Sequence, residues 1–509
     1  MEVEKSQQHA KTTVSSDATQ FEVKRSKHGV KLEPQPSDDP QDPLNWSMRR
    51  KITILGVICL SAFAGIAQGG ANVSGVVVQS FTYHKSVGAM VDSLSAGIAG
   101  TCSGPIFAMA LAHYIGRCPV ILWGLLLSMC NVWSASMTGP HDYIAFCISR
   151  WLAGTFGAFP TALGGGFIVD MFFLHQRGKA FAFYTTCAIF GVAFANTFSG
   201  FIVSHAGWPA QFWWVIGMLG LCFILVAIFV EDTTYPREGS NPPPKVSTLS
   251  QRILTFVPVR GNMERCPSNT HGPFDSILIG IQPPTLLAGC FIMLVFCWST
   301  AVLNNLSVYL QLQPLEGGYG FTPQQNALFS FTNWISTAVA QLFGYLFNDR
   351  IPLWRCRRSG GIWRPEFRLY PLLAVPMTLS PIALGVFGAS LEHHYHYMVL
   401  AFAVWIMNIA DVICLPIVNA YVVECFLDYA AEVTTILTFY RLIFGLCISF
   451  FLPAWTAAVG IGWTYGMMAF FVLIAYGLTW ILELKGPAIR EMSMSRFKSN
   501  EEGEKLFGE

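Results

Sequence analysis

Residues 397–422 read YMVLAFAVWIMNIADVICLPIVNAYV, and Asp411 is the only charged residue among them. A helix of about 20 apolar residues crosses the hydrocarbon core of a membrane, so this run predicts a transmembrane helix. The whole chain of 509 residues has a similar composition, with 53% hydrophobic and 12% charged residues. A typical soluble protein carries about 25% charged residues. The sequence therefore predicts a polytopic membrane protein.

Apolar runs of this length occur twelve times along the chain. They lie at residues 52–73, 91–111, 118–137, 143–171, 180–203, 212–230, 285–310, 324–347, 369–391, 397–422, 432–458 and 463–484. The polar residues 231–283 separate the sixth run from the seventh and include three consecutive prolines. That composition is typical of a flexible linker. We therefore predict an all-α membrane protein with twelve transmembrane helices in two six-helix halves.

Basic residues gather on one predicted side of the membrane. When the amino terminus is assigned to the cytosol, 28 of the 31 Lys and Arg residues fall on the cytosolic side. The positive-inside rule then predicts that both termini are cytosolic. The predicted regions are a disordered cytosolic tail (1–51), an amino-terminal half (52–230), a cytosolic linker (231–283), a carboxy-terminal half (284–484) and a cytosolic tail (485–509).

Several short motifs occur in the order known from one family. They read DPLNWS at 42–47, GPIFA at 104–108, GRCPV at 116–120, RWLAG at 150–154, GGG at 164–166 and RGKA at 177–180. As an ordered set, from about residue 42 to residue 490, they resemble the drug:proton antiporter branch of the fungal major facilitator superfamily, with its DPxNWS motif. The resemblance implies the major facilitator fold, transport by alternating access, and a cavity lined by spans 1, 4, 7 and 10.

The chain also departs from that family pattern. His113 stands where the family has an acid, and Cys118 replaces a basic residue. The resemblance implies that the acid belongs to a cytosolic latch, which would be weakened here or, because imidazole titrates near neutral pH, sensitive to pH. The alternative is that His113 has no role. The fifth span lacks both prolines of the family's GPxxGPxxGG motif, which leaves a facilitator or symporter open beside an antiporter.

Three charged residues lie deep inside predicted spans, away from the span ends: Arg150, Asp411 and Arg441. A charge in the membrane costs roughly 2.5 to 3.5 kcal/mol on insertion scales, so such residues usually face a protein interior or an aqueous path. We therefore assign all three to the substrate or proton path. The alternative for Arg150 is a bond to helix carbonyls. Asp411 and Arg441 lie at similar predicted depths, and the alternatives are a structural ion pair or a coupling switch.

Uncharged polar and aromatic residues supply further candidates. We add to the path Gln68, Asn72, Trp298, Asn304, Asn305 and Asn408. The alternative for the amides is helix-to-helix hydrogen bonding, worth about 0.6 kcal/mol each. The family motifs assign to a cytosolic gate His113, Gly116, Arg117, Asp170, Arg177 and Lys179.

These observations predict a secondary transporter that exports a drug-like compound or secondary metabolite, with protons as a possible coupling ion. The alternatives are an importer or facilitator of a nutrient such as an organic acid or polyamine, and a non-transporting membrane sensor. The sequence has no Gly-rich phosphate loop, HExxH or GxSxG motif, so we expect no catalytic residue, metal or cofactor. The expected partners are a small organic substrate, protons and the lipid bilayer, without nucleic acid. We expect a monomer in the plasma membrane.

Overall fold

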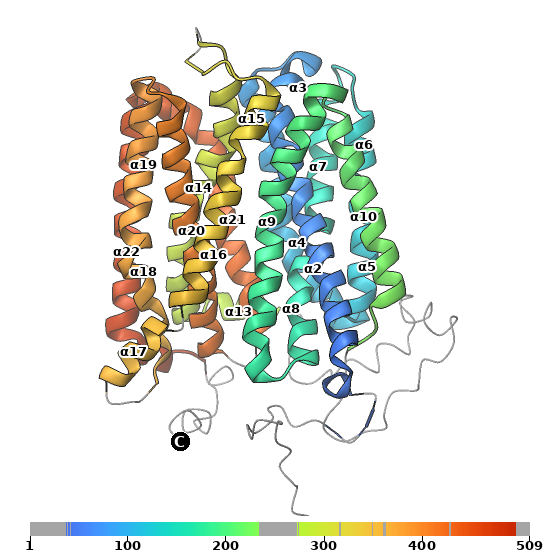
Figure 1. Ribbon diagram of the computed structural model, residues 1–509, viewed down its shortest axis with the longest axis vertical. Coiled ribbons are helices and arrows are strands. Elements are labelled where there is room, and N and C mark those ends of the chain that lie inside the picture. Colours follow the sequence, from blue (N-terminus) through green and yellow to red (C-terminus); the bar gives the residue numbers. More distant parts are fainter. Residues whose placement is uncertain are drawn as a thin grey trace, which may run out of the picture.

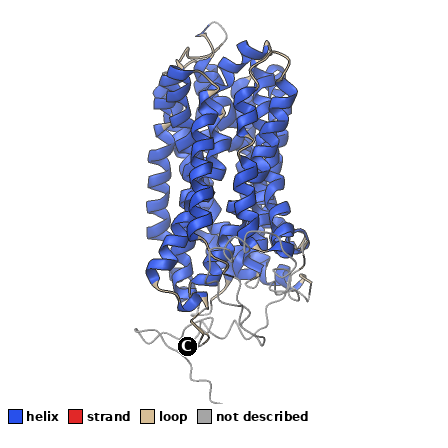
Figure 2. Cartoon of the chain, turned by 90° about the vertical axis from the view of Figure 1, so that its right-hand side faces the viewer, coloured by secondary structure: helices blue, strands red, loops and turns tan. Residues whose placement is uncertain are grey.

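The computed structural model describes residues 37, 39–40, 42–233, 272, 274–314, 317–348, 350–359, 363–426 and 429–494. All regular structure in these residues is helical, which confirms the predicted all-α class (Figure 1, Figure 2). The predictions for the amino-terminal tail up to residue 36, for 234–271 of the linker and for 495–509 concern residues outside the described part.

The helices fall into two sets along the chain. The first set comprises η1 (Pro43–Asn45), α2 (Met48–Ala71), η2 (Val73–Gly75), α3 (Val76–Tyr83), α4 (Val87–Ile115), α5 (Arg117–Ser128), α6 (Asn131–Ser136), α7 (Tyr143–Gly157), α8 (Phe159–Met171), α9 (Leu174–Ala206) and α10 (Ala210–Phe229). The second set comprises α13 (Asp275–Gly280), α14 (Pro283–Gln311), α15 (Pro323–Phe329), α16 (Phe331–Phe347), α17 (Arg350–Arg358), η4 (Pro365–Leu369), α18 (Tyr370–Ala374), α19 (Pro376–Glu392), α20 (Tyr397–Cys425), α21 (Ala430–Val459) and α22 (Ile461–Glu491).

The described helices agree with the predicted number of membrane crossings. Eleven helical segments in the described residues are long and apolar enough to cross a membrane. The remaining predicted span, 324–347, is divided at Ser330 into α15 and α16, which together run along the bundle (Figure 1). Its halves are each too short to cross alone. Residues 275–280, which we assigned to the linker, form the short helix α13.

The two ends of the bundle differ in their polar contacts. We call the end where α2 begins and α22 ends the lower end, as drawn in Figure 1, and the opposite end, where α3 and α15 lie, the upper end. Four ion pairs lie near the lower end, each within one half: Arg50–Glu231, Arg117–Asp170 (2.6 Å), Arg368–Glu424 (2.8 Å) and Arg490–Glu366 (3.1 Å). They tie the ends of neighbouring helices of one half together.

Hydrogen bonds between uncharged groups join the two halves near the upper end. Asn196 Nδ2 of α9 donates to Ser330 Oγ at 3.0 Å, between α15 and α16. Trp334 Nε1 of α16 donates to Thr197 Oγ1 at 3.1 Å, and its ring lies 4.9 Å from that of Phe190. We call the residues of these cross-half contacts the upper seal. The seal also includes the bond from Gln311 Nε2 to the carbonyl of Ser74, at 3.3 Å.

Close helix packing within the first half depends on glycine. Helices α4 and α7 meet at Gly100, where an added Cβ would lie 2.7 Å from the backbone nitrogen of Thr155 and 3.0 Å from the carbonyl carbon of Gly154. Backbone atoms cannot rotate away as a flexible side chain can. Small residues at such crossings allow membrane helices to approach closely and gain van der Waals contact.

We therefore expect Gly100→Ala to lower the melting temperature of the purified protein. Forcing an extra methyl into a packed interface typically costs about 1–3 kcal/mol. The matched control is Gly56→Ala, because a Cβ at Gly56 on α2 meets no described atom within 4 Å. The control should keep or raise the melting temperature, since alanine favours helix over glycine. Equal melting temperatures for the two variants would contradict this account of the α4–α7 contact.

Candidate functional site

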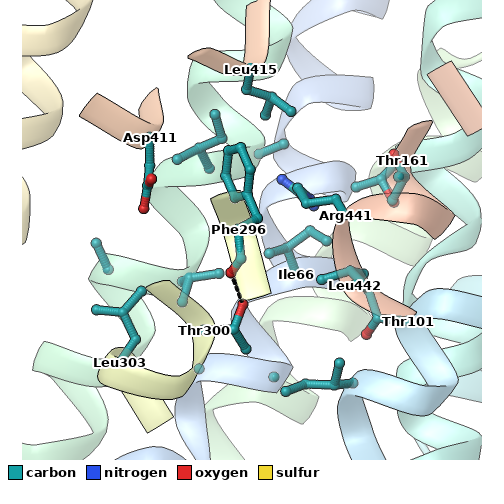
Figure 3. Close-up of a pocket in the computed structure, with 18 of the residues that line it drawn as sticks. Ile66, Thr101, Thr161, Phe296, Thr300, Leu303, Asp411, Leu415, Arg441 and Leu442 are labelled. Atoms are coloured by element: carbon teal, nitrogen blue, oxygen red, sulfur yellow. Dashed lines mark hydrogen bonds between the residues drawn. The ribbon is translucent and has the colours of Figure 1, made fainter. Parts of the chain in front are cut away.

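A cavity of about 380 Å³ lies between the two halves. Its wall includes residues of α2, α4, α7, α8 and α9 from the first half and of α14, α16, α20 and α21 from the second. Apolar side chains such as Ile66, Leu303 and Leu442 line it beside hydroxyl groups of threonines (Figure 3). The lining extends to Thr161 of α8 and Thr434 of α21, on the side of the lower end. The contacts of the upper seal lie toward the opposite end.

Asp411 and Arg441 both line this cavity, and no ion pair joins them in the described structure. Asp411 on α20 is 6% exposed, and its Oδ1 has no hydrogen-bond partner among the described residues. The guanidinium carbon of Arg441 on α21 lies 5.9 Å from the centre of the Phe296 ring. In the view of Figure 3 this ring lies between the two charged groups. The geometry therefore disfavours the structural ion pair that we considered from the sequence.

Arg150 on α7 lines the cavity, but its terminal nitrogens donate hydrogen bonds to residues of the first half. It is 1% exposed. Its Nη1 donates to Asn131 Oδ1 at 2.6 Å, and its Nη2 donates to the carbonyl of Gln68 at 2.7 Å. That carbonyl lies in the last turn of α2, which ends at Ala71. Carbonyl groups in the last turn of a helix have no amide donor within the helix, and Arg150 supplies a donor here. A cation at a helix carboxy terminus is also favoured by the helix dipole.

Two of the predicted amides line the cavity. Asn304 of α14 is 8% exposed, and its Nδ2 has no hydrogen-bond partner among the described residues. Asn408 of α20 donates from Nδ2 to Ser336 Oγ at 2.6 Å and so joins α20 to α16. Asn304 thus has a buried, unpartnered donor beside the cavity, whereas Asn408 is largely committed to helix packing.

Gln68 and Asn72 do not line the cavity. Gln68 accepts a hydrogen bond from Asn131 Nδ2 at 2.7 Å. Asn72 donates to Ser93 Oγ at 3.2 Å and is fully buried. Both side chains hold α2 against its neighbours, which is the alternative that we considered for the amides.

Asn305 and Trp298 also lie away from the cavity wall. Asn305 Nδ2 donates to the carbonyl of Ala301, one turn earlier in α14, at 2.9 Å. The ring of Trp298 stacks on that of Phe471, with the centres 5.7 Å apart. Trp298 is therefore part of the packing between α14 and α22.

The predicted gate residues gather near the lower end. Arg117 pairs with Asp170, which also accepts a hydrogen bond from Thr233 Oγ1 at 2.8 Å. Gly116 has φ +89°, a backbone conformation that favours glycine, and it ends α4 immediately before Arg117. The pair thus joins the start of α5, the end of α8 and the residues that follow α10.

The other gate residues have different surroundings. Arg177 donates to the carbonyls of Val169 at 2.8 Å and Phe172 at 3.0 Å, which fixes the turn between α8 and α9. His113 is partly exposed, and its ring lies 5.5 Å from that of Tyr114 in an edge-on contact. Lys179 lies in α9, but its side chain is outside the described part of the structure.

Sequence reasoning missed the polar face of α21. Thr434 and Thr438 line the cavity together with Arg441. These residues recur at intervals of four and three, which puts them on one side of a helix. The predicted position of Arg441 toward the interior could therefore have identified the two threonines as lining residues.

A twelve-helix bundle with a central cavity between two halves is the architecture of a secondary membrane transporter. The chain belongs to the Major Facilitator Superfamily, whose sequence pattern matches residues 54–450. This result confirms the predicted fold and the expectation that the protein is a transporter and not an enzyme.

Individual proteins with similar sequences come from fungi. The MFS-type transporter atr4 of Stereocaulon alpinum is 25% identical over 474 residues, covering 90% of this chain and 82% of that protein. The efflux pump radE of Floropilus chiversii is 25% identical over 472 residues, covering 89% and 83%. Among solved structures, the xylose transporter XylE from E. coli in a partially occluded inward open conformation superposes with a TM-score of 0.59. It is 14% identical and covers 85% of this chain and 98% of that chain, so it supports the fold alone.

Proposed function

We propose that this transporter exports a small organic molecule, drug-like or a secondary metabolite, in exchange for protons across the plasma membrane. The name of its relative radE, an efflux pump, supports the direction. The ordered motifs and the DPLNWS segment support the drug:proton antiporter branch. The concentration of basic residues supports a cytosolic lower end and cytosolic termini. A monomer suffices, because one chain supplies both walls of the cavity.

The observation that carries the proton coupling is the environment of Asp411. Its carboxyl group lies on the cavity wall of the second half, with Oδ1 free of hydrogen bonds from the described residues. A carboxyl group at the interface between two moving halves can bind a proton from one side and release it to the other. Arg117 and Asp170 are the proposed contacts of a cytosolic gate.

The lining of the cavity supports an amphipathic organic substrate. Apolar side chains alternate with amide and hydroxyl groups, and a volume of about 380 Å³ lies in the range typical of sites for drug-sized ligands. Asn304 on the cavity wall adds an amide group whose Nδ2 has no hydrogen-bond partner among the described residues.

The proposal is tested by efflux from cells that overproduce the protein, against a panel of fluorescent or radiolabelled organic compounds. We expect reduced accumulation of at least one compound, and we expect a proton uncoupler to abolish the effect. Asp411→Asn keeps the shape of the side chain but cannot carry the proton, so it should remove proton-driven efflux while exchange of labelled for unlabelled substrate continues. Glu491→Gln, at an exposed carboxyl group at the end of α22, is the matched control and should transport normally.

Two outcomes would contradict parts of this proposal. Uncoupler-sensitive uptake in place of efflux would favour the alternative of an importer. Normal proton-driven transport by Asp411→Asn, at normal abundance in the membrane, would show that another group carries the proton.

A further inference from the structure

Arg441 is a cation on the cavity wall without an anionic or hydrogen-bonding partner in the described structure. It lines the cavity from α21, and its Nε has no hydrogen-bond acceptor. Its described contact is the Phe296 ring, 5.9 Å from the guanidinium carbon. Arg150 differs, because both of its terminal nitrogens donate to protein acceptors. The Nε of Arg150 is also unpaired, but its two terminal nitrogens are occupied, so the guanidinium of Arg441 is the more available of the two for a ligand.

The charges of the lining give the cavity an excess of positive charge. Its charged lining residues, in the described structure, are Arg150, Asp411 and Arg441. A buried unpaired charge is costly, and a cavity of one sign attracts ligands of the other sign. Two cations against one carboxyl group therefore favour an anionic ligand over a polyamine.

The surroundings of Arg441 indicate what kind of anion fits. A guanidinium presents a planar fork of N–H donors that matches both oxygens of a carboxylate. Beside it lie the ring of Phe296 and the apolar side chain of Leu442 (Figure 3). On the same face of α21, Thr438 donates its hydroxyl to the carbonyl of Thr434 at 2.8 Å. The other polar lining residues of this helix are therefore uncharged and do not compete for the guanidinium.

We propose that the substrate of this transporter is an organic monocarboxylic acid. Its carboxylate binds the guanidinium of Arg441, and its apolar or aromatic body packs on Phe296 and fills the cavity toward Leu303. The guanidinium of Arg441 has no protein acceptor in the described structure and can bind one carboxylate, which favours a monocarboxylic acid. The carboxyl group of Asp411, on the other side of the Phe296 ring in Figure 3, then lies toward the far side of the ligand, where it can accept a hydrogen bond from a hydroxyl or amine. This inference rests on the proposed transport function and adds the chemical class of its substrate.

The test measures binding to the purified full-length protein in detergent, from ligand-dependent shifts of the melting temperature. The probes form two matched sets: 4-hydroxycinnamate, its primary amide and tyramine, and hexanoate, its amide and hexylamine. We expect at least one carboxylate to stabilise the protein and its amide and amine to do so much less. Arg441→Gln should weaken carboxylate binding by about tenfold or more. Arg441→Lys keeps the charge without the fork and should have an intermediate effect.

The control is Arg357→Gln, which removes the same charge from an exposed position on α17 and should leave carboxylate binding unchanged. The substrate class is wrong if an amine or amide binds as tightly as its acid, if no carboxylate binds, or if Arg441→Gln binds the acid as tightly as the wild type. If neutral or cationic compounds are exported equally by the wild type and by Arg441→Gln, the proposed transport function is supported and the proposed substrate class is wrong. Carboxylate binding that depends on Arg441, without efflux or uptake in cells, would instead refute the transport function.

Discussion

Replacing Arg150 with methionine should strongly destabilise the protein, whereas the same replacement at Arg441 should not. The two arginines occupy facing walls of one cavity, but their hydrogen bonds differ. Without Arg150, the Asn131 Oδ1 and the carbonyl of Gln68 each lose a donor at a buried position. An unsatisfied buried acceptor costs about 1–3 kcal/mol, so the variant should lose roughly 2–6 kcal/mol. Removing Arg441 leaves no described acceptor unsatisfied and removes a costly unpaired charge.

The comparison is made by melting temperature and by the fraction of protein that elutes as a single species after detergent extraction. Arg150→Met should fall in both measures, and Arg441→Met should equal or exceed the wild type. Arg150→Lys keeps the charge but reaches only one of the two acceptors, so it should lie between Arg150→Met and the wild type. Equal stability of Arg150→Met and Arg441→Met would mean that the network around Arg150 contributes little to folding.

Gly200→Leu should nearly abolish transport without reducing the amount of folded protein. Gly200 on α9 faces α15 across the boundary between the halves, and an added Cβ would lie 2.7 Å from the Cβ of Ala327. A leucine there prevents the halves from approaching at the upper end. Each half keeps its own packing, so the protein folds but cannot reach the state described here. We expect transport to fall by about tenfold or more, because a carrier that cannot close one side cannot complete its cycle.

The measurement combines substrate efflux with labelling of a cysteine at Asn304, close below the upper seal, by a membrane-impermeant maleimide. Gly200→Leu should increase labelling from the upper side while efflux is lost. Gly217→Leu is the matched control, since a Cβ at Gly217 on α10 meets no described atom within 4 Å. Full transport by Gly200→Leu at normal abundance would be incompatible with closure by direct contact between α9 and α15.

The sequence predicts those features for which the membrane imposes a large free-energy cost on polar and charged groups. The twelve crossings followed from the length of the apolar runs. Arg150, Asp411 and Arg441, which the sequence assigned to a substrate or proton path because lipid excludes charge, line the cavity. The side that an amide faces could not be predicted. Lipid-facing and interior-facing surfaces of a membrane helix are both apolar, so periodicity does not tell Asn72, which binds a neighbouring helix, from Asn304, which faces the cavity.

The family motifs predicted positions better than contacts. Arg117 and Asp170 were both assigned to the gate, but their direct ion pair depends on the turn at Gly116 that brings α5 toward the end of α8. The division of span 324–347 into two helices at Ser330 could not be predicted from the sequence, because no proline or glycine adjoins Ser330. Tertiary contact with Asn196 accompanies that division.

The distribution of ion pairs implies that ionic strength acts on two properties of the protein separately. The four ion pairs near the lower end join helices within one half and are partly exposed. At physiological salt the screening length is about 8 Å, so added salt weakens such contacts. The upper seal consists of hydrogen bonds between uncharged groups, which salt does not screen. High salt should therefore loosen each half and lower the melting temperature of the protein, while the hydrogen bonds of the upper seal persist.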